Sequence, residues 1–291
     1  MGIQDLAKLL YAEKKNKTLS SEFKHTYYKT VLAQNPDHKP KVDMFSPSSL
    51  YKCERELYYM IMGYEKEPSQ VPVHLLGSWR ALANTGTDRH ERIQTTITKM
   101  KENGMDIEWI DVEKYVNEHG PETTKLAEET DPEKAKAAKE DSMETKLYSS
   151  VISSRFKCDG LVLIDGEYYI IEIKTMNSRK WSKSKTKGDI LDEHELQASA
   201  YSIAIGVDNV LYIYENRDNG QLLVFEKEVT SEMKHKVMNK ILTVQEYKRI
   251  GKIPPKKNCD MKFCDYKRRC EMDGQTADLF GDHDFSEGMD L

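Results

Sequence analysis

The sequence contains no apolar run that approaches the roughly 20 residues of a membrane-spanning helix. Its first residues, MGIQDLAKLLYAEKKNK, lack the uninterrupted apolar core of a secretory signal peptide. Leu6 also departs from the myristoylation pattern, which requires Ser or Thr at that position. We find no internal repeats. These absences exclude a membrane-spanning or repeat protein, and they predict a cytoplasmic chain without a membrane partner.

Basic residues are absent from the last part of the chain. Residues 271–291 contain no Lys or Arg but seven acidic residues: Glu271, Asp273, Asp278, Asp282, Asp284, Glu287 and Asp290. The whole chain carries a net charge of −5, so removing these seven leaves the first 270 residues at +2. The main part of the chain is therefore compatible with a nucleic-acid partner, and residues 271–291 are predicted to be an acidic, disordered tail.

The apolar patterns indicate helices first, then strands with an inserted helix, then a helix and a cysteine-rich end. Helices are expected at 1–35, 50–62, 86–103, 192–205 and 231–250, and strands at 107–117, 148–165, 168–175, 209–219 and 221–229. Ser46 or Ser48 is the expected cap of the second helix. Residues 120–147 are charged and mostly non-apolar, which predicts an exposed loop or a mobile helix. This order favours an α+β or mixed α/β core with one main sheet.

Two ionisable residues interrupt the most apolar of these strands, residues 168–175, YYIIEIKT. Glu172 and Lys174 are costly to bury there unless they are paired or bind a ligand. Their spacing of two places both side chains on one face of the strand, about 6.5 Å apart. The strand therefore offers a carboxylate and an ammonium to the same place.

A second carboxylate is expected beside this pair. Asp159 lies in the preceding apolar strand, and Asp165–Gly166 is the expected turn between the two strands. Two carboxylates on adjacent strands can bind a hard divalent cation, Mg²⁺ or Mn²⁺. Such a cation polarises a phosphodiester and lowers the pKa of a bound water. A nearby Lys174 can orient or deprotonate that water, or stabilise the developing charge on the phosphorane.

A basic segment, NSRKWSKSKTKGD, follows the same strand and is expected to be a loop. Five basic residues surround Trp181: Arg179, Lys180, Lys183, Lys185 and Lys187. Basic residues interleaved with an aromatic suit phosphates and an unstacked base of a nucleic acid. A solvated surface loop is the alternative, but the position of the segment directly after Glu172 and Lys174 favours a DNA contact.

Three of the five cysteines lie close together near the end of the chain. Cys259, Cys264 and Cys270, together with the distant Cys53, can complete a four-thiolate site for Zn²⁺ or a [4Fe–4S] cluster. A cytoplasmic protein is not expected to use them as disulfides. Cys158 neighbours Asp159 and points to the opposite face of its strand, so we interpret it as a buried small hydrophobe.

The order Asp159, short hairpin, Glu172-x-Lys174 resembles the PD-(D/E)XK nuclease superfamily, which has a restriction-endonuclease-like core. Two further features occur in its RecB-like branch: His90 on a helix upstream of the Asp, and Gln197-x-x-x-Tyr201 on the helix after the Lys. The resemblance implies that His90, Asp159, Glu172 and the Ile173 carbonyl hold Mg²⁺ or Mn²⁺, and that Lys174 acts on the water. It also implies that Gln197 and Tyr201 hold DNA, with contacts from Arg179, Lys180, Trp181 and Lys183.

The cysteine arrangement resembles the iron–sulfur exonucleases of the AddB and CRISPR-adaptation type, which take one Cys from before the nuclease core and three from after it. The resemblance implies a [4Fe–4S] cluster on Cys53, Cys259, Cys264 and Cys270, with Zn²⁺ as the alternative. One interval departs from the pattern: four residues separate Cys259 from Cys264, where the family has two.

Three parts of the chain follow from the resemblance: an N-terminal helical segment, residues 1–45, a nuclease domain, residues 46–270, and the tail, residues 271–291. The implied activity is a metal-dependent exonuclease acting on DNA ends or single strands in recombination, repair or end processing, in a prokaryotic or phage-infected cell. A structure-specific endonuclease and a non-catalytic DNA-binding scaffold are the alternatives. The tail is expected to dock on a recombination or replication protein or to shield the basic groove, or only to keep the chain soluble.

Overall fold

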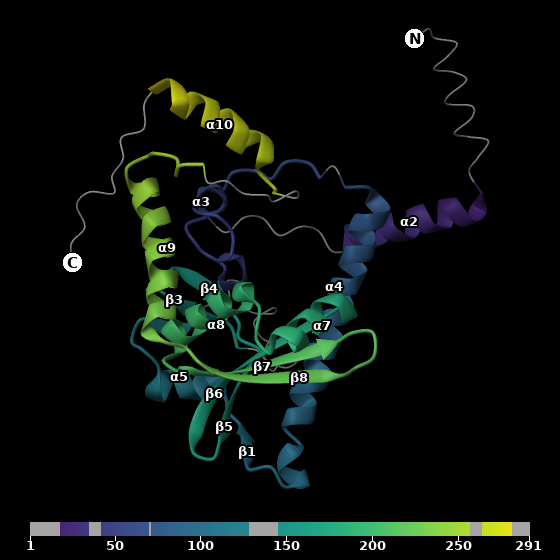
Figure 1. Ribbon diagram of the computed structural model, residues 1–291, viewed down its shortest axis with the longest axis vertical. Coiled ribbons are helices and arrows are strands. Elements are labelled where there is room, and N and C mark those ends of the chain that lie inside the picture. The colour runs from purple at the N-terminus through teal and green to yellow at the C-terminus, as the bar shows by residue number, and fades with distance from the viewer. Residues whose placement is uncertain (1–17, 35–41, 70, 128–144, 257–263, 281–291) are drawn as a thin grey trace. The chain divides into compact units, whose positions relative to one another are not determined.

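The computed structural model describes residues 18–34, 42–69, 71–127, 145–256 and 264–280 (Figure 1). Its helices are α2 (Leu19–Gln34), α3 (Glu54–Ile61), α4 (Val73–Ile97), α5 (Val112–His119), α7 (Ser178–Lys187), α8 (Asp192–Ile205), α9 (Ser231–Arg249) and α10 (Lys267–Phe280), with 3₁₀ turns at Pro47–Ser49 and Met100–Asn103. Its strands are β1 (Ile107–Trp109), β2 (Thr124–Leu126), β3 (Leu147–Ser149), β4 (Ser154–Phe156), β5 (Gly160–Ile164), β6 (Glu167–Met176), β7 (Asn209–Asn216) and β8 (Leu222–Glu228).

The chain divides into two compact units. The smaller unit combines residues 1–39 with residues 68–88, and within it Gly77 packs so closely on Tyr28 that a side chain at Gly77 would overlap it. The larger unit combines residues 40–67 with residues 89–291 and contains both sheets. No helix among the described residues is both long and apolar enough to cross a membrane.

The larger unit is built on a mixed five-stranded sheet with the order β1-β5-β6-β7-β8. Neighbouring strands are antiparallel except β6 and β7, which are parallel and are joined through α7 and α8. A parallel connection needs such a crossover, and the crossover brings helices onto one face of the sheet. Figure 1 shows α7, α8 and α9 on the same side of the sheet. The predicted mixed α/β core with one main sheet is confirmed.

The two faces of the sheet bury different sets of side chains, because successive residues of a strand point to opposite sides. One face, with Ile170, Tyr212 and Tyr214, belongs to the larger core, which includes α8 and α9. The other face, with Ile171, Ile173 and Ile213, packs in a separate cluster against Ile93 and Ile97 at the end of α4. Glu172 and Lys174 share the parity of Ile170, so they lie on the face that α8 covers.

Several expected elements are confirmed. Helix α8 has the expected bounds, and α9, β6, β7 and β8 lie where the patterns predicted them. The turn between β5 and β6 is also as expected: Asp165 and Gly166 have φ of 50° and 87°. Positive φ at both central residues is the signature of a two-residue type I′ turn, which matches the twist of a hairpin.

The strand expected at 107–117 is wrong after Trp109, and the one expected at 148–165 is interrupted. Asp111 accepts hydrogen bonds from the backbone of Glu113 and Lys114, which starts α5 instead of continuing the strand. Residues 147–164 form three short strands, and β3 and β4 join β2 in a second, three-stranded sheet. Because β2 lies at Thr124–Leu126, the expected exposed loop at 120–147 is wrong there, and residues 128–144 lie outside the described residues.

The cap expected for the second helix is also wrong. Cys53, not Ser46 or Ser48, caps α3, and its Sγ accepts the N–H of Glu56. The helix expected at 86–103 begins at Val73 and ends at Ile97, before a 3₁₀ turn. The tail, residues 271–291, was expected to be disordered, but α10 makes it helical as far as Phe280. Asp273 of α10 accepts a hydrogen bond of 2.7 Å from the Tyr59 hydroxyl. Residues 281–291 lie outside the described part.

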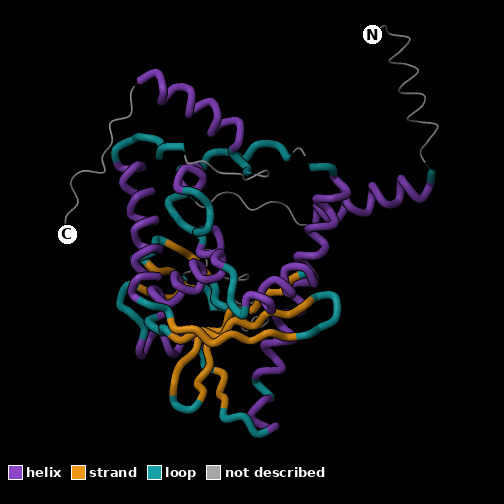
Figure 2. The backbone as a smooth tube through the Cα atoms, in the orientation of Figure 1, coloured by secondary structure: helices purple, strands orange, loops and turns teal. Residues whose placement is uncertain are grey.

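The basic segment is a helix rather than the expected loop, and Figure 2 colours it as helix at the position of α7 in Figure 1. Asn177 caps it by accepting the N–H of Lys180, and Gly188 ends it with φ of 67°. Trp181 is only 6 % exposed and packs in the larger core. The expectation that Trp181 stacks on a base is therefore wrong for this conformation, because helix formation turns its ring inward.

We predict that Gly160→Ala destabilises the protein, because a Cβ at the start of β5 would overlap the indole of Trp109. Overpacking of this kind costs about 1–3 kcal/mol in free energy of unfolding, measurable by urea denaturation. The same substitution in a Trp109→Phe background should cost clearly less. An equal cost in both backgrounds would show that the indole is not responsible.

Candidate active site

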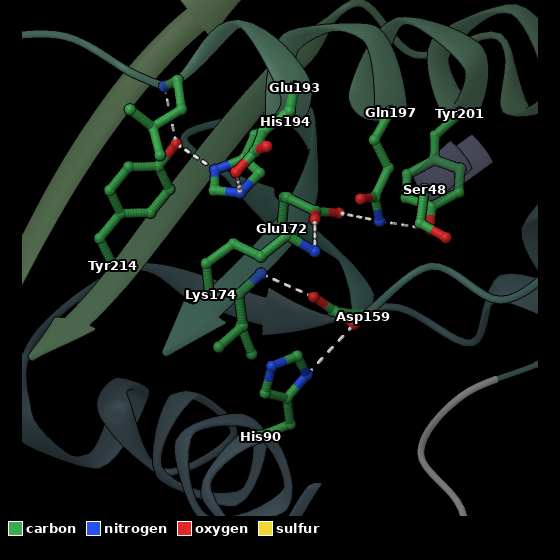
Figure 3. A network of polar contacts seen from close by, with 12 residues as sticks. Ser48, His90, Asp159, Glu172, Lys174, Glu193, His194, Gln197, Tyr201 and Tyr214 are labelled. Carbon is green, nitrogen blue, oxygen red and sulfur yellow. Dashed lines mark hydrogen bonds and ion pairs between the residues drawn. The ribbon is translucent and has the colours of Figure 1, made fainter. Parts of the chain in front are cut away.

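Glu172 and Lys174 lie together beneath α8, as predicted, and form an ion pair (Figure 3). The Glu172 side chain has no exposed surface, and its Oε2 accepts a hydrogen bond of 3.3 Å from Gln197 Nε2. Burial raises the pKa of Glu172 to about 7, although Lys174 acts to lower it. Burial works to lower the pKa of Lys174, but Glu172 and Asp159 together raise it above its usual value. Strand β6 therefore holds a buried carboxylate with a raised pKa next to an amine whose raised pKa keeps it protonated.

Asp159 lies directly before the first residue of β5, beside Glu172 and Lys174. Its Oδ2 accepts the backbone N–H of Ile173 at 2.6 Å, and its Oδ1 lies 3.4 Å from His90 Nδ1. Gln94, one turn after His90 on α4, donates to the Asp159 carbonyl at 2.6 Å. Helix α4 thus brings His90 to the carboxylate, as Figure 3 shows. The Ile173 N–H orients Asp159, and a role for the Ile173 carbonyl stays a prediction.

Gln197 and Tyr201 occupy one face of α8, as their spacing predicted. Gln197 Nε2 lies 2.9 Å from Tyr201 Oη as well as near Glu172. The Tyr201 ring stacks on Phe156 with a centroid distance of 5.3 Å. Both side chains are more than nine-tenths buried, so their polar atoms are fixed in direction. They extend the polar cluster from Glu172 along the helix.

The donor atoms of this cluster are of the chemical types that a hard divalent cation prefers. Mg²⁺ and Mn²⁺ bind carboxylate oxygens, and imidazole nitrogen is an acceptable further ligand. Asp159 and Glu172 supply such oxygens, and the negative charge of Asp159 acts on Glu172. Among the residues that the structure describes, no three His, Cys, Asp or Glu side chains are grouped tightly enough to hold an ion. A cation bound at Glu172 would compete with Lys174 for the Glu172 carboxylate.

Glu215 is a buried carboxylate that the sequence analysis missed. It lies on β7, is 2 % exposed, and receives Arg89 at 3.2 Å and Arg92 at 2.5 Å from α4. Arg89 also donates to the carbonyl of Arg217 at 2.9 Å. His90 lies between these arginines in sequence, so the contacts fix the part of α4 that carries it. Glu172 was found as an acid within an apolar run. Glu215 is likewise an acid in the apolar run VLYIYEN, so the same signal could have revealed it.

His194 is a second missed residue, on the same face of α8 as Gln197 and Tyr201. Its Nδ1 lies 2.6 Å from Tyr214 Oη, and it is 8 % exposed. Burial, with Lys174 and Lys180 nearby, lowers the pKa of His194 to about 3. The imidazole is therefore neutral at physiological pH. Its i, i+3 spacing from Gln197 was a usable signal.

Three of the four predicted cluster cysteines lie around α3 and α10. Cys53 caps α3, Arg55 of the same helix donates to the Cys270 carbonyl at 3.1 Å, and Cys53 is among the charges that act on Cys264. Burial raises the pKa of Cys264 to about 11. Cys259 lies outside the described residues. Cys158 is 1 % exposed in the larger core, which confirms it as a buried small hydrophobe.

Comparisons with known proteins include distant likenesses to solved structures. No protein-family model and no curated protein matches the chain. Its fold is similar to the crystal structure of SSO0001, with 16 % identity, a TM-score of 0.43, and coverage of 86 % of this chain and 96 % of that one. It is also similar to LHK-Exo, an alkaline exonuclease from Laribacter hongkongensis, with 12 % identity, a TM-score of 0.32, and coverage of 77 % and 97 %. For the crystal structure of LHK-Exo in complex with dAMP, the identity is 13 % and the TM-score 0.35, with coverage of 70 % of this chain and 95 % of that one. Likenesses this distant assign no function to the chain.

We predict that His194 makes stability depend on pH. Its pKa is lower in the folded chain than in the unfolded chain, so the unfolded state binds more protons and stability falls as pH drops from about 6.5 towards about 3. Between about pH 7 and pH 5.5 this loss amounts to about 1 kcal/mol, and His194→Phe should remove it. Urea unfolding at several pH values measures the slopes. Parallel slopes for the two proteins would contradict a buried neutral His194.

Proposed function

We propose that the chain is a metal-dependent deoxyribonuclease that acts as an exonuclease on DNA ends or single strands. The observation that carries this proposal is the buried Glu172 carboxylate between Lys174 and Gln197, with Asp159 and His90 beside it. A fold gains no stability from a fully buried carboxylate whose pKa is raised, so its retention suits a ligand that needs the charge.

The protonated Lys174 suits orienting a water and stabilising charge better than deprotonating that water. Its raised pKa makes it a poor base, so we assign it to orienting the attacking water and to stabilising negative charge on the phosphorane. Gln197, held by Glu172 and Tyr201, would direct its amide towards the substrate strand. Arg179, Lys180 and Lys183 on α7 would bind backbone phosphates, because helix α7 follows directly after β6.

His90, Asp159 and Glu172, with the Ile173 carbonyl, would hold Mg²⁺ or Mn²⁺. Such an ion, when bound, supplies Lewis-acid polarisation of the phosphodiester and a water of lowered pKa. Asp159 is already aimed by the Ile173 N–H, and His90 by the contacts of Arg89 and Arg92 with Glu215. These contacts reduce the ordering that ion binding would require.

We further propose that Cys53, Cys259, Cys264 and Cys270 hold a [4Fe–4S] cluster, with Zn²⁺ as the alternative. The support is the position of Cys53, Cys264 and Cys270 near one end of α3, from segments more than 200 positions apart in sequence. Partly buried thiols that come from sequence positions far apart suit a metal that joins the two ends of the domain. The proposed domain spans residues 46–270, and the proposed setting is recombination, repair or end processing in the cytoplasm, with a partner protein at the acidic tail.

We predict that Glu172→Gln lowers the rate of DNA hydrolysis with Mg²⁺ or Mn²⁺ by about a hundredfold or more, because it removes the charge that binds the ion. Glu167→Gln, at the exposed start of β6, is the matched control and should keep full activity. End-labelled linear DNA measures the rate.

The same assay on linear and circular DNA separates an exonuclease from an endonuclease. Cleavage of linear DNA alone supports the proposal. Equal cleavage of circular DNA would replace it by an endonuclease. Binding of DNA by the wild type without hydrolysis in either ion would leave only a DNA-binding scaffold.

We predict that Cys53→Ser and Cys264→Ser lose bound iron and its visible absorption, whereas Cys158→Ala keeps both, because Cys158 lies in the apolar core. The proteins should be purified without oxygen and their iron, sulfide and zinc contents measured. Zinc in the wild type, lost in Cys53→Ser, would establish the alternative metal, and no metal in the wild type would contradict both.

A further inference from the structure

The Glu193 carboxylate lies near two lysines and a histidine at the amino end of α8. Its Oε1 lies 3.5 Å from Lys180 Nζ on α7 and 3.5 Å from His194 Nε2. Its charge also acts on Lys174 of β6. The Glu193 side chain is 37 % exposed and that of Lys180 is 61 % exposed, so solvent and solutes can reach the contact. Figure 3 shows Glu193 and His194 adjacent to Lys174 and Glu172.

The hydrogen bonds of His194 determine what it presents to Glu193. The Tyr214 hydroxyl accepts the N–H of Leu191 at 3.1 Å, so its own hydrogen is available for His194 Nδ1 at 2.6 Å. A neutral imidazole whose Nδ1 accepts must carry its proton on Nε2. His194 Nε2 therefore carries the proton, and it lies 3.5 Å from Glu193 Oε1.

Lys180 and His194 thus form a donor pair from two different helices, with the charge of Lys174 close by. The first turn of α8 adds the positive end of a helix dipole, which favours an anion. Glu193 supplies an anion at this place from a side chain that is 37 % exposed. A phosphate oxygen is chemically equivalent to a carboxylate oxygen as an acceptor for these donors.

We propose that Glu193 occupies a phosphate subsite next to the catalytic carboxylates, and that a phosphate of the substrate strand displaces it to bind Lys180 and His194. This inference rests on the proposed function. Glu193 would then compete with the substrate, and it would keep Lys180 and His194 oriented in the free protein. The phosphate is either the terminal monoester of a strand or an internal diester, since both present the same oxygens.

The test is binding of a labelled single-stranded oligonucleotide to the full chain in EDTA, measured by fluorescence anisotropy, so that no hydrolysis occurs. Glu193→Gln should bind about fivefold more tightly than the wild type. Glu195→Gln is the matched control, because Glu195 lies in the same turn of α8 but pairs with Lys236 at 3.8 Å. It removes the same charge and should leave the affinity close to that of the wild type.

Salt dependence distinguishes a phosphate contact from a structural effect. Lys180→Gln should lower the slope of log affinity against log salt by about 0.7, the value for one contact to a single strand. Lys236→Gln should leave the slope unchanged. Oligonucleotides with a 5′-phosphate or a 5′-hydroxyl separate the two sources: a Glu193→Gln gain only with the 5′-phosphate assigns the monoester, and a gain with both assigns the diester.

Equal affinities of Glu193→Gln and Glu195→Gln, in a protein whose wild type binds and cleaves DNA, would overturn the subsite and leave the proposed function intact. A wild type that neither binds nor cleaves DNA would overturn both. Because the Glu193 side chain is partly exposed, its Gln variant should fold, and thermal melting checks this.

Discussion

The candidate site depends on one costly fact, the full burial of the Glu172 carboxylate in the centre of the main sheet. Removing a carboxylate from water costs several kcal/mol unless charges and hydrogen bonds compensate. Lys174 compensates from the same strand and Gln197 from α8, and the raised pKa of Glu172 shows that this compensation is incomplete. The crossover from β6 to β7 is what makes the arrangement possible, because it carries α8 back over the face on which both ionisable side chains lie.

The part of the fold that could be predicted is the part decided by local composition. Strand β6 and helix α8 are long, and both are largely buried runs of apolar residues, so their bounds were found. The errors at Asp111 and Asn177 have a different cause. Each of these residues caps a helix: Asp111 accepts two backbone N–H groups and Asn177 accepts one. The caps start α5 and α7 although the composition that follows is strand-like or loop-like, and Trp181 is buried on the helix that Asn177 caps.

The site shows the same division between local and distant information. Glu172 with Lys174, and Gln197 with Tyr201, are neighbours in sequence, so spacing alone brought each pair together. Glu215 with Arg92 are 123 positions apart, and Tyr214 with His194 are 20 apart and on different elements. No periodicity encodes such pairs. Their only local trace is a polar residue in an apolar stretch, which marks that a partner exists without saying which one.

Three glutamates near the carboxyl end of β6 and its neighbours each meet cations, but their burial gives them different consequences. Glu172 and Glu215 are at most 2 % exposed, so neither can leave its partners without stranding charge inside the protein. Glu193 is 37 % exposed, so water can replace its contacts at little cost. The two buried carboxylates therefore fix the positions of Lys174 and of the helix that bears His90, whereas the exposed one only occupies its place. In the proposed phosphate subsite the two kinds have different parts, because the buried charges keep the geometry and the partly exposed charge can be displaced by the ligand.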